Sequence, residues 1–207
     1  MSEDYPQTWF RRRDESPDPR FYSVARKVTH IDDGAIAAVT SLYAELLPEG
    51  AEVLDLMSSW RAHLPPAAAG RVVGLGMNAE ELADNPQLDE VLVADLNADP
   101  VLPFGDASFD AVVCCVSVQY LTRPTEVFAE VARVLRPDGP FVITFSNRCF
   151  PDKAVAAWMA GGDEDHVTLV SAYFECSVDF GPVEAGASRP GWGDPLYAVW
   201  ARSLSTS

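Results

Sequence analysis

Short apolar runs alternate along this chain with segments in which apolar residues recur at the spacing of an α-helix. The runs are VLDLM (53–57), RVVGLG (71–76), VLVADL (91–96), FDAVVCCVSV (109–118) and PFVITFSN (140–147). Uninterrupted apolar runs of this length are typical of parallel strands that are covered on both faces. The alternation therefore predicts an α/β fold, a three-layer α/β/α sandwich around a mainly parallel, Rossmann-like sheet.

Four of the intervening segments are predicted to be helices, namely 32–47, 124–135, 152–161 and 167–174. The first begins at Asp32 or Asp33, because either side chain can cap it. The second begins at Pro124, whose missing N–H costs nothing in the first turn of a helix. Asp152 is expected to cap the short third helix, which ends at a pair of glycines.

The two ends of the chain differ in pattern from the middle. GPVEAGAS (181–188) and PLYAVWARS (195–203) flank a turn rich in Gly and Pro, which predicts a C-terminal antiparallel hairpin. Residues 1–20 are polar and rich in Pro, so we expect a loose N-terminal arm ahead of a single domain at 21–207. Three consecutive arginines at 11–13 are expected to form a solvated charge cluster on that arm.

Charge and composition limit the classes of partner that this protein is expected to bind. The formal net charge is −16, which disfavours nucleic acid because binding to it depends on neutralising phosphates. No apolar stretch approaches a membrane span and the first residues lack a signal-peptide core, so we expect a cytoplasmic protein without a membrane partner. The four cysteines show no C-x-x-C spacing, so no metal site is predicted. Cys114 and Cys115 are adjacent in a strand and should point to opposite faces.

The candidate site lies at the strand ends, because ligands of parallel sheets bind beyond the carboxyl ends of the strands. The most specific segments there are LPFGDASFDAVVCCVSVQYL (102–121) and VFAEVARVLRPDGPFVITFSN (127–147). In this order they resemble the type 11 branch of the class I S-adenosylmethionine-dependent methyltransferases. That family has an L-P-F, a turn, an S-F-D-x-V strand and a helix ending L-x-P-G-G. The resemblance covers about residues 52–147, with a plausible tail to 202.

The resemblance implies the class I methyltransferase fold, S-adenosylmethionine as cofactor and methyl transfer to a small-molecule acceptor. In the family the first strand ends D/E-x-G-x-G-x-G, and here Asp55 keeps the acidic position. The three glycine positions hold other residues, namely Met57, Ser59 and Arg61. VLDLMSSW (53–60), together with an upstream FY…VTHIDDGA, resembles a divergent subgroup in which this glycine loss would be the normal design.

The resemblance also implies a set of cofactor-binding residues at the strand ends. They are Asp55, Met57, Ser58, Ser59, Gly76, Met77, Asn78, Asp95, Leu96, Asn97, Val116 and Tyr120. Asp95 would accept a hydrogen bond from the adenine amino group, the Leu96 backbone N–H would reach the ring, and Asp55 would orient the amino group of the cofactor. Either acid can instead be an ordinary turn residue.

Serines take the place of the glycine loop after the first strand. Ser58 and Ser59 would hold the cofactor carboxylate from the N-terminus of a following helix, or they only cap that helix. Trp60 is expected to pack under the same helix or to form a wall of the acceptor pocket. Two more tryptophans, Trp158 and Trp192, are weaker candidates for that wall.

At the end of the second strand the family has an acid that binds the ribose hydroxyls, and this chain has Gly76. Asn78 offers a neutral hydrogen bond in its place, and Met77 either covers adenine or belongs to the core. Restoring an acid with Gly76→Asp is expected to tighten cofactor binding, provided that the backbone tolerates a side chain there.

Residues ahead of the first strand often fold over cofactor and substrate in this family. Tyr22 and Arg26 are therefore candidate substrate contacts. His30 is a candidate general base, because its ordinary pKa lies near neutrality. The competing interpretation, favoured for His30, is that it only introduces the following helix.

Two other functions compete with methyl transfer. The loss of the ribose acid and of three glycines favours a methyltransferase-fold protein without catalysis, which acts as a binding or scaffold subunit. A nicotinamide-dependent dehydrogenase is less favoured, because no G-x-G-x-x-G follows the first strand. The sequence leaves open the acceptor atom, the use of a general base and the oligomeric state.

Overall fold

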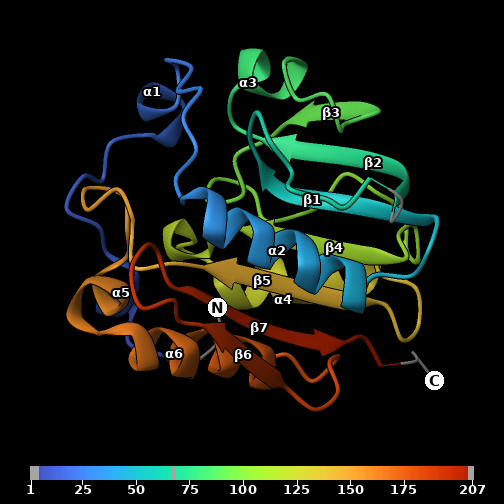
Figure 1. The fold of residues 1–207 in the computed structure, drawn as a ribbon. Helices are drawn as coiled ribbons and strands as arrows, with labels where there is room; N and C mark the ends of the chain where they lie inside the picture. The colour runs from blue at the N-terminus through green and yellow to red at the C-terminus, as the bar shows by residue number, and fades with distance from the viewer. Residues whose placement is uncertain (1–4, 67–68, 205–207) are drawn as a thin grey trace.

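The computed structural model describes residues 5–66 and 69–204, and its centre is a seven-stranded sheet in the order β3-β2-β1-β4-β5-β7-β6 (Figure 1). The strands are β1 (Ala51–Ser58), β2 (Ala69–Gly76), β3 (Glu90–Val93), β4 (Ala111–Cys115), β5 (Pro140–Phe145), β6 (Glu184–Ser188) and β7 (Leu196–Arg202). β1 to β5 are parallel, whereas β7 is antiparallel to both β5 and β6. The predicted parallel sheet with a C-terminal hairpin is therefore confirmed.

Helices lie on both faces of this sheet, as the apolar runs indicated. They are η1 (Gln7–Phe10), α1 (Asp18–Phe21), α2 (Asp33–Leu46), α3 (Ala79–Ala83), η2 (Val118–Tyr120), α4 (Pro124–Val134), α5 (Ala156–Ala160) and α6 (Asp163–Glu175). In Figure 1, α2 lies in front of the sheet and α4 behind it, which gives the three predicted layers. Cys114 packs in the core on the α4 side and Cys115 against the core on the α2 side, as predicted.

The boundaries of the helices follow from local capping chemistry. The Asp32 carboxylate accepts a hydrogen bond from the Ala35 N–H at 2.9 Å and caps α2, one of the two predicted possibilities. α4 begins at Pro124 as predicted. Asp152, by contrast, caps no helix, because α5 begins only after Val155, whose side chain makes no cap hydrogen bond. The prediction for Asp152 is therefore wrong.

No helix connects β1 to β2 among the described residues 59–66, so the helix that Ser58 and Ser59 were expected to open is absent. The segment HLPPAAAG carries two consecutive prolines, Pro65 and Pro66, and a residue that precedes proline is disfavoured in helical conformation. Residues of β1 and β2, such as Val53 and Val72, belong to the same core cluster as Val39 of α2.

Residues 5–20 are tied to the domain by buried charges, in contrast to the loose arm that the composition predicted. Lys153 is fully buried, and its Nζ lies 3.1 Å from an Asp14 carboxylate oxygen and 3.2 Å from one of Asp18. Arg12 donates to both oxygens of Asp18, at 2.8 and 2.7 Å, with only 7% of its side chain exposed. Arg12 is therefore part of a buried ion-pair network, and the prediction of a solvated cluster is wrong for it. A buried charge persists only where opposite charges and hydrogen bonds compensate it.

We expect Lys153→Met to lower the free energy of unfolding by about 3 kcal/mol, because it leaves buried Asp18 with half of its compensation. The control is Arg13→Ala, which removes an ion pair to Asp152 between side chains that are 71% and 60% exposed. That change should stay below about 1 kcal/mol. Urea unfolding measures both values, and an equal loss in the two variants would contradict the buried network.

Candidate functional site

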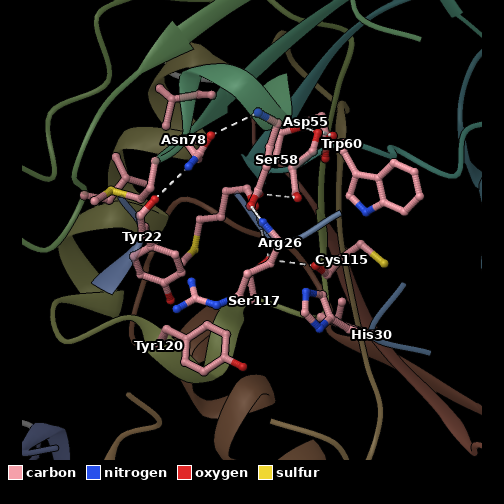
Figure 2. Close-up of a pocket in the computed structure, with 18 of the residues that line it drawn as sticks. Tyr22, Arg26, His30, Asp55, Ser58, Trp60, Asn78, Cys115, Ser117 and Tyr120 are labelled. Carbon is pink, nitrogen blue, oxygen red and sulfur yellow. Dashed lines mark hydrogen bonds between the residues drawn. The ribbon is translucent and has the colours of Figure 1, made fainter. Parts of the chain in front are cut away.

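A pocket opens over the carboxyl ends of β1, β2, β3 and β4, at the point where the strand order reverses between β1 and β4 (Figure 2). Ligands of open α/β sheets bind at such a reversal. Every predicted site residue lines it, namely Tyr22, Arg26, His30, Asp55, Met57, Ser58, Ser59, Gly76, Met77, Asn78, Asp95, Leu96, Asn97, Val116 and Tyr120. Their positions agree with one binding site, and their individual roles stay predictions.

The floor of the pocket is shaped by a bulge at the end of β1. The pairing register shifts between Leu56 and Ser58, so that Met57 and Ser58 together lie opposite Gly76. Met57 stands at the first glycine position of the family and has φ 58°, the left-handed conformation that glycine usually supplies. Val116, at the end of β4, also has a positive φ of 46°, which is rare for a β-branched residue. Such strain is concentrated at ligand sites.

The bulge explains why residue 76 is a glycine. It brings the carbonyl oxygen of Ser58 onto the place that a Cβ of residue 76 would occupy, with the Leu82 side chain 3.2 Å from the same place. Gly76 itself does not have positive φ. The expectation that Gly76→Asp would restore a ribose-binding acid is therefore wrong, because the β1 backbone excludes any side chain there.

Asp55 is a buried carboxyl group without a cation. It is 2% exposed and accepts a hydrogen bond from the Ser58 hydroxyl at 2.5 Å. Burial raises the pKa of Asp55 to about 7, and the bond from Ser58 only partly opposes this. No Lys, Arg or His of the described chain lies within ion-pair distance of Asp55, so a ligand ammonium group would find an unpaired acid at the end of β1.

The two serines do not present their hydroxyl protons to the pocket. Ser58 donates to Asp55, and Ser59 donates to Glu81 at 2.6 Å. The hypothesis that these hydroxyls hold the cofactor carboxylate therefore disagrees with the geometry, because protein acids already accept both protons. Without a helix after β1, the expected first-turn N–H groups are absent as well.

Two asparagines that were predicted to contact the cofactor also make hydrogen bonds within the protein. The Asn78 carbonyl oxygen caps α3 by accepting from the N–H groups of Glu80 and Glu81, both at 3.0 Å, and its amide donates to the Tyr22 carbonyl at 2.8 Å. The Asn97 amide nitrogen donates to Asp18 at 2.8 Å and to the Tyr120 carbonyl at 2.9 Å. Asn97 thus has no amide N–H left for a ligand, and Asn78 has at most one.

The geometry of Asp95 is compatible with both interpretations that the sequence left open. One carboxylate oxygen accepts from the N–H groups of Asn97 at 3.0 Å and Ala98 at 3.2 Å, which is a turn interaction. The same side chain lines the pocket beside Leu96. A single carboxylate can therefore hold its own turn and accept a further hydrogen bond from a ligand.

The segment ahead of α2 closes the pocket opposite the strand ends. In Figure 2 the side chains of Tyr22, Arg26 and His30 enter the same space as Asp55. His30 packs edge-on against Phe150 at 5.2 Å, and burial lowers its pKa although the charge of Glu81 acts the other way. A neutral imidazole near pH 7 suits the predicted general base.

Several lining residues were missed at the sequence level. Glu81 accepts hydrogen bonds from the Arg26 backbone N–H at 2.5 Å and from Ser59, and so joins α3 to both sides of the pocket. Phe150, in the loop after β5, stacks on Tyr120 with 6.0 Å between the ring centroids. An acid in a short helix and a lone aromatic in a loop carry no periodic signal that would reveal such roles.

Of the three tryptophans proposed as pocket walls, only Trp60 lines the pocket in the described chain. Its indole N–H donates to the Val28 carbonyl at 3.0 Å, so it bridges the β1 loop to the segment ahead of α2. Trp158 is buried in the core and stacks on His166 at 3.9 Å, whereas Trp192 is 91% exposed. Those two predictions are wrong.

Within residues 5–66 and 69–204, no helix is both long and apolar enough to cross a membrane. The same residues contain no cluster of three or more His, Cys, Asp or Glu side chains that is placed to hold a metal ion.

Comparison with known proteins shows a similarity between part of the chain and methyltransferases. The family of methyltransferase domains matches residues 58–143. A curated relative, the biotin biosynthesis bifunctional protein BioHC of Teredinibacter turnerae, is 35% identical over 82 residues, which are 36% of this chain and 14% of that protein. The match thus spans about a seventh of the length of this curated relative.

Solved structures share the fold at low identity. The (4+2)-cyclase SpnF has a TM-score of 0.62 at 15% identity over 91% of this chain and 93% of its own. A complex of the Haloferax volcanii methyltransferase activator Trm112 with a methyltransferase contains a chain with a TM-score of 0.60 at 17% identity, over 84% and 92%. An S-adenosylmethionine-dependent methyltransferase from Mesorhizobium loti has a TM-score of 0.54 at 18% identity, over 82% and 99%. The family match and these folds confirm the resemblance seen in the sequence.

We expect Gly76→Ala to lower the free energy of unfolding by about 3 kcal/mol, because its Cβ would overlap the Ser58 carbonyl. Gly105→Ala is the control, since a Cβ there would meet only the Ser108 hydroxyl at 3.6 Å, in an exposed turn. It should be neutral or slightly stabilising. Denaturant unfolding measures the free energy of unfolding of both variants. A Gly76→Ala protein as stable as wild type would refute the close approach of the Ser58 carbonyl to residue 76.

The raised pKa of Asp55 predicts a pH-dependent contribution to stability. Between about pH 4 and pH 7 the unfolded chain releases this proton while the folded protein keeps it, so the contribution of Asp55 falls as the pH rises through that window. Asp55→Asn keeps the shape and carries no charge. The melting temperature of wild type minus that of Asp55→Asn should therefore decrease from pH 4 to pH 7, and a constant difference would contradict the raised pKa.

Proposed function

We propose that this protein is a class I methyltransferase, which binds S-adenosylmethionine in the pocket at the ends of β1 to β4 and methylates a small molecule held against Tyr22, Arg26 and His30. The observation that carries the proposal is Asp55, a buried carboxyl group whose only hydrogen-bond partner is Ser58. The ammonium group of the cofactor is a cation of the kind that this acid lacks. The proposal therefore rests on the chemistry of a side chain in the pocket as well as on the similarity of the fold.

The ends of the pocket differ in a way that orients the cofactor. We assign the adenine to Asp95 and the Leu96 backbone, after β3, and the amino group to Asp55, after β1, because all three residues line the pocket. The backbone of Ser58 and Gly76 lies between them, with no side chain at 76. We infer that the ribose packs on this backbone floor and is recognised by neutral groups.

Methyl transfer needs alignment and exclusion of water more than a strong base. When bound, the cofactor supplies an electrophilic methyl group on a sulfonium sulfur. The chain holds the acceptor with the segment ahead of α2, which Trp60 fastens to the β1 loop and Asn78 to α3. For an acceptor that must lose a proton, we assign the role of base to His30, which burial keeps neutral near pH 7 and which lies on the segment ahead of α2.

A second candidate is binding without catalysis. The altered glycine loop favours it, since a shared fold does not establish catalysis. The two candidates separate in one assay. A catalytic protein turns over S-adenosylmethionine to S-adenosylhomocysteine with an acceptor, whereas a scaffold binds the cofactor without consuming it.

We expect Asp95→Asn to weaken binding of S-adenosylhomocysteine about tenfold, because the amide can keep the turn but places a donor opposite the adenine amino group. Asp99→Asn is the matched control. Its carboxylate also accepts a turn hydrogen bond, from the Val101 N–H at 3.1 Å, and it does not line the pocket. Titration calorimetry measures the affinity of both variants for S-adenosylhomocysteine.

Absence of any heat and of any rise in melting temperature with millimolar S-adenosylhomocysteine would refute the proposed function. Equal affinity in wild type and Asp95→Asn would refute only the role of Asp95.

A further inference from the structure

Arg26 is a cation in the pocket without an anion. The other Lys and Arg side chains that are buried or half-buried in the described chain each lie within 4 Å of a carboxylate. Arg26 has no such partner, although acids outnumber bases 31 to 15 in this protein. Its guanidinium makes one hydrogen bond, from Nη1 to the Phe21 carbonyl at 3.0 Å. A guanidinium has five N–H donors, so most of its capacity is unused.

The arginine is nevertheless held in place. Its backbone N–H donates to Glu81, and its neighbour Lys27 pairs with Glu80 at 2.8 Å and with Asp84 at 2.5 Å. The guanidinium carbon lies 4.4 Å from the ring centroid of Phe21, and 5.6 Å from that of Phe150 in the loop after β5. Aromatic rings stabilise a guanidinium through its face and leave the N–H groups at its edge available.

Figure 2 shows Arg26 extending into the pocket among Tyr22, Ser117 and Tyr120. The acid next to it, Glu81, is already occupied, since it accepts from Ser59 and from the Arg26 backbone. An unpaired and preorganised guanidinium inside a pocket is a receptor for a planar anion, which it binds through two parallel hydrogen bonds.

We propose that Arg26 binds a carboxylate group of a ligand in this pocket, an inference that rests on the proposed function of the site. Two ligands can supply that group. One is the methyl acceptor, which would then be a carboxylic acid. The other is the cofactor, whose carboxylate finds the hydroxyl protons of Ser58 and Ser59 already donated to protein acids. In both cases Arg26 supplies a half-buried positive charge, whereas the cation of the altered loop, Arg61, is exposed and lies over the Trp60 ring at 3.9 Å.

The cofactor arm compares S-adenosylhomocysteine with 5′-methylthioadenosine, which lacks the amino-acid part. If Arg26 binds the cofactor carboxylate, Arg26→Gln lowers the affinity for S-adenosylhomocysteine at least tenfold and leaves the affinity for 5′-methylthioadenosine unchanged. Arg26→Lys keeps the charge and recovers part of the affinity. Arg20→Gln removes an exposed cation on α1 that does not line the pocket, and it should change the affinity for neither ligand more than about twofold.

The acceptor arm uses 4-hydroxybenzoate and the neutral 4-hydroxybenzamide, titrated into the protein with and without S-adenosylhomocysteine. If the acceptor carries the carboxylate, wild type prefers the benzoate at least tenfold and Arg26→Gln abolishes that preference. The proposal is overturned if Arg26→Gln leaves the affinity for S-adenosylhomocysteine unchanged and wild type shows no preference for the benzoate. If wild type binds neither nucleoside, the proposed function fails, and the benzoate titration on ligand-free protein still decides the role of Arg26.

Discussion

The close approach of the Ser58 carbonyl to Gly76 is the constraint on which the rest of this site depends. The bulge that ends β1 lies at the close approach of the Ser58 carbonyl to β2, and residue 76 accommodates the carbonyl because it has no side chain. The loss of the glycine loop and the loss of the ribose acid are therefore one change. Met57 takes up the left-handed backbone that a glycine would have provided, and the glycine appears one strand away, at 76.

This exchange also alters the electrostatics of the pocket. Where a helix N-terminus would have offered N–H groups, the chain continues as a loop whose serines donate to Asp55 and Glu81. Among the described residues, the pocket is left with a buried acid that has no cation, Asp55, and a half-buried guanidinium that has no anion, Arg26. Unpaired charges of both signs in one pocket suit a ligand that carries an ammonium and a carboxylate, or two ligands that carry one each.

The sequence correctly predicted those elements of the fold that depend on local periodicity and on turn residues. The strands at 53–57, 71–76 and 140–147, the helix that begins at Pro124 and the C-terminal hairpin all follow from periodicity and turn residues, and the site followed because ligands bind at strand ends. The packing of residues 5–20 did not follow, since it depends on Lys153, which is distant in sequence from Asp14 and Asp18.

The roles of single polar side chains were equally inaccessible. Asn78 and Asn97 stand where a ligand contact is expected, yet their partners are the Tyr22 carbonyl and Asp18, which only the tertiary fold brings near. The reason for Gly76 was hidden in the same way, because it lies in the register between two strands. The position of the site at the strand ends could thus be predicted from the sequence. The hydrogen-bond partners of the polar side chains in that site could not.

The most direct test of this account is a crystal structure of the protein with S-adenosylhomocysteine. The account predicts adenine beside Asp95, the amino group on Asp55, and the ribose on the backbone of Ser58 and Gly76 with their pairing unchanged. A structure in which the β1 bulge has straightened to admit the ligand, or in which Trp60 fills the pocket and the ligand binds elsewhere, would contradict it.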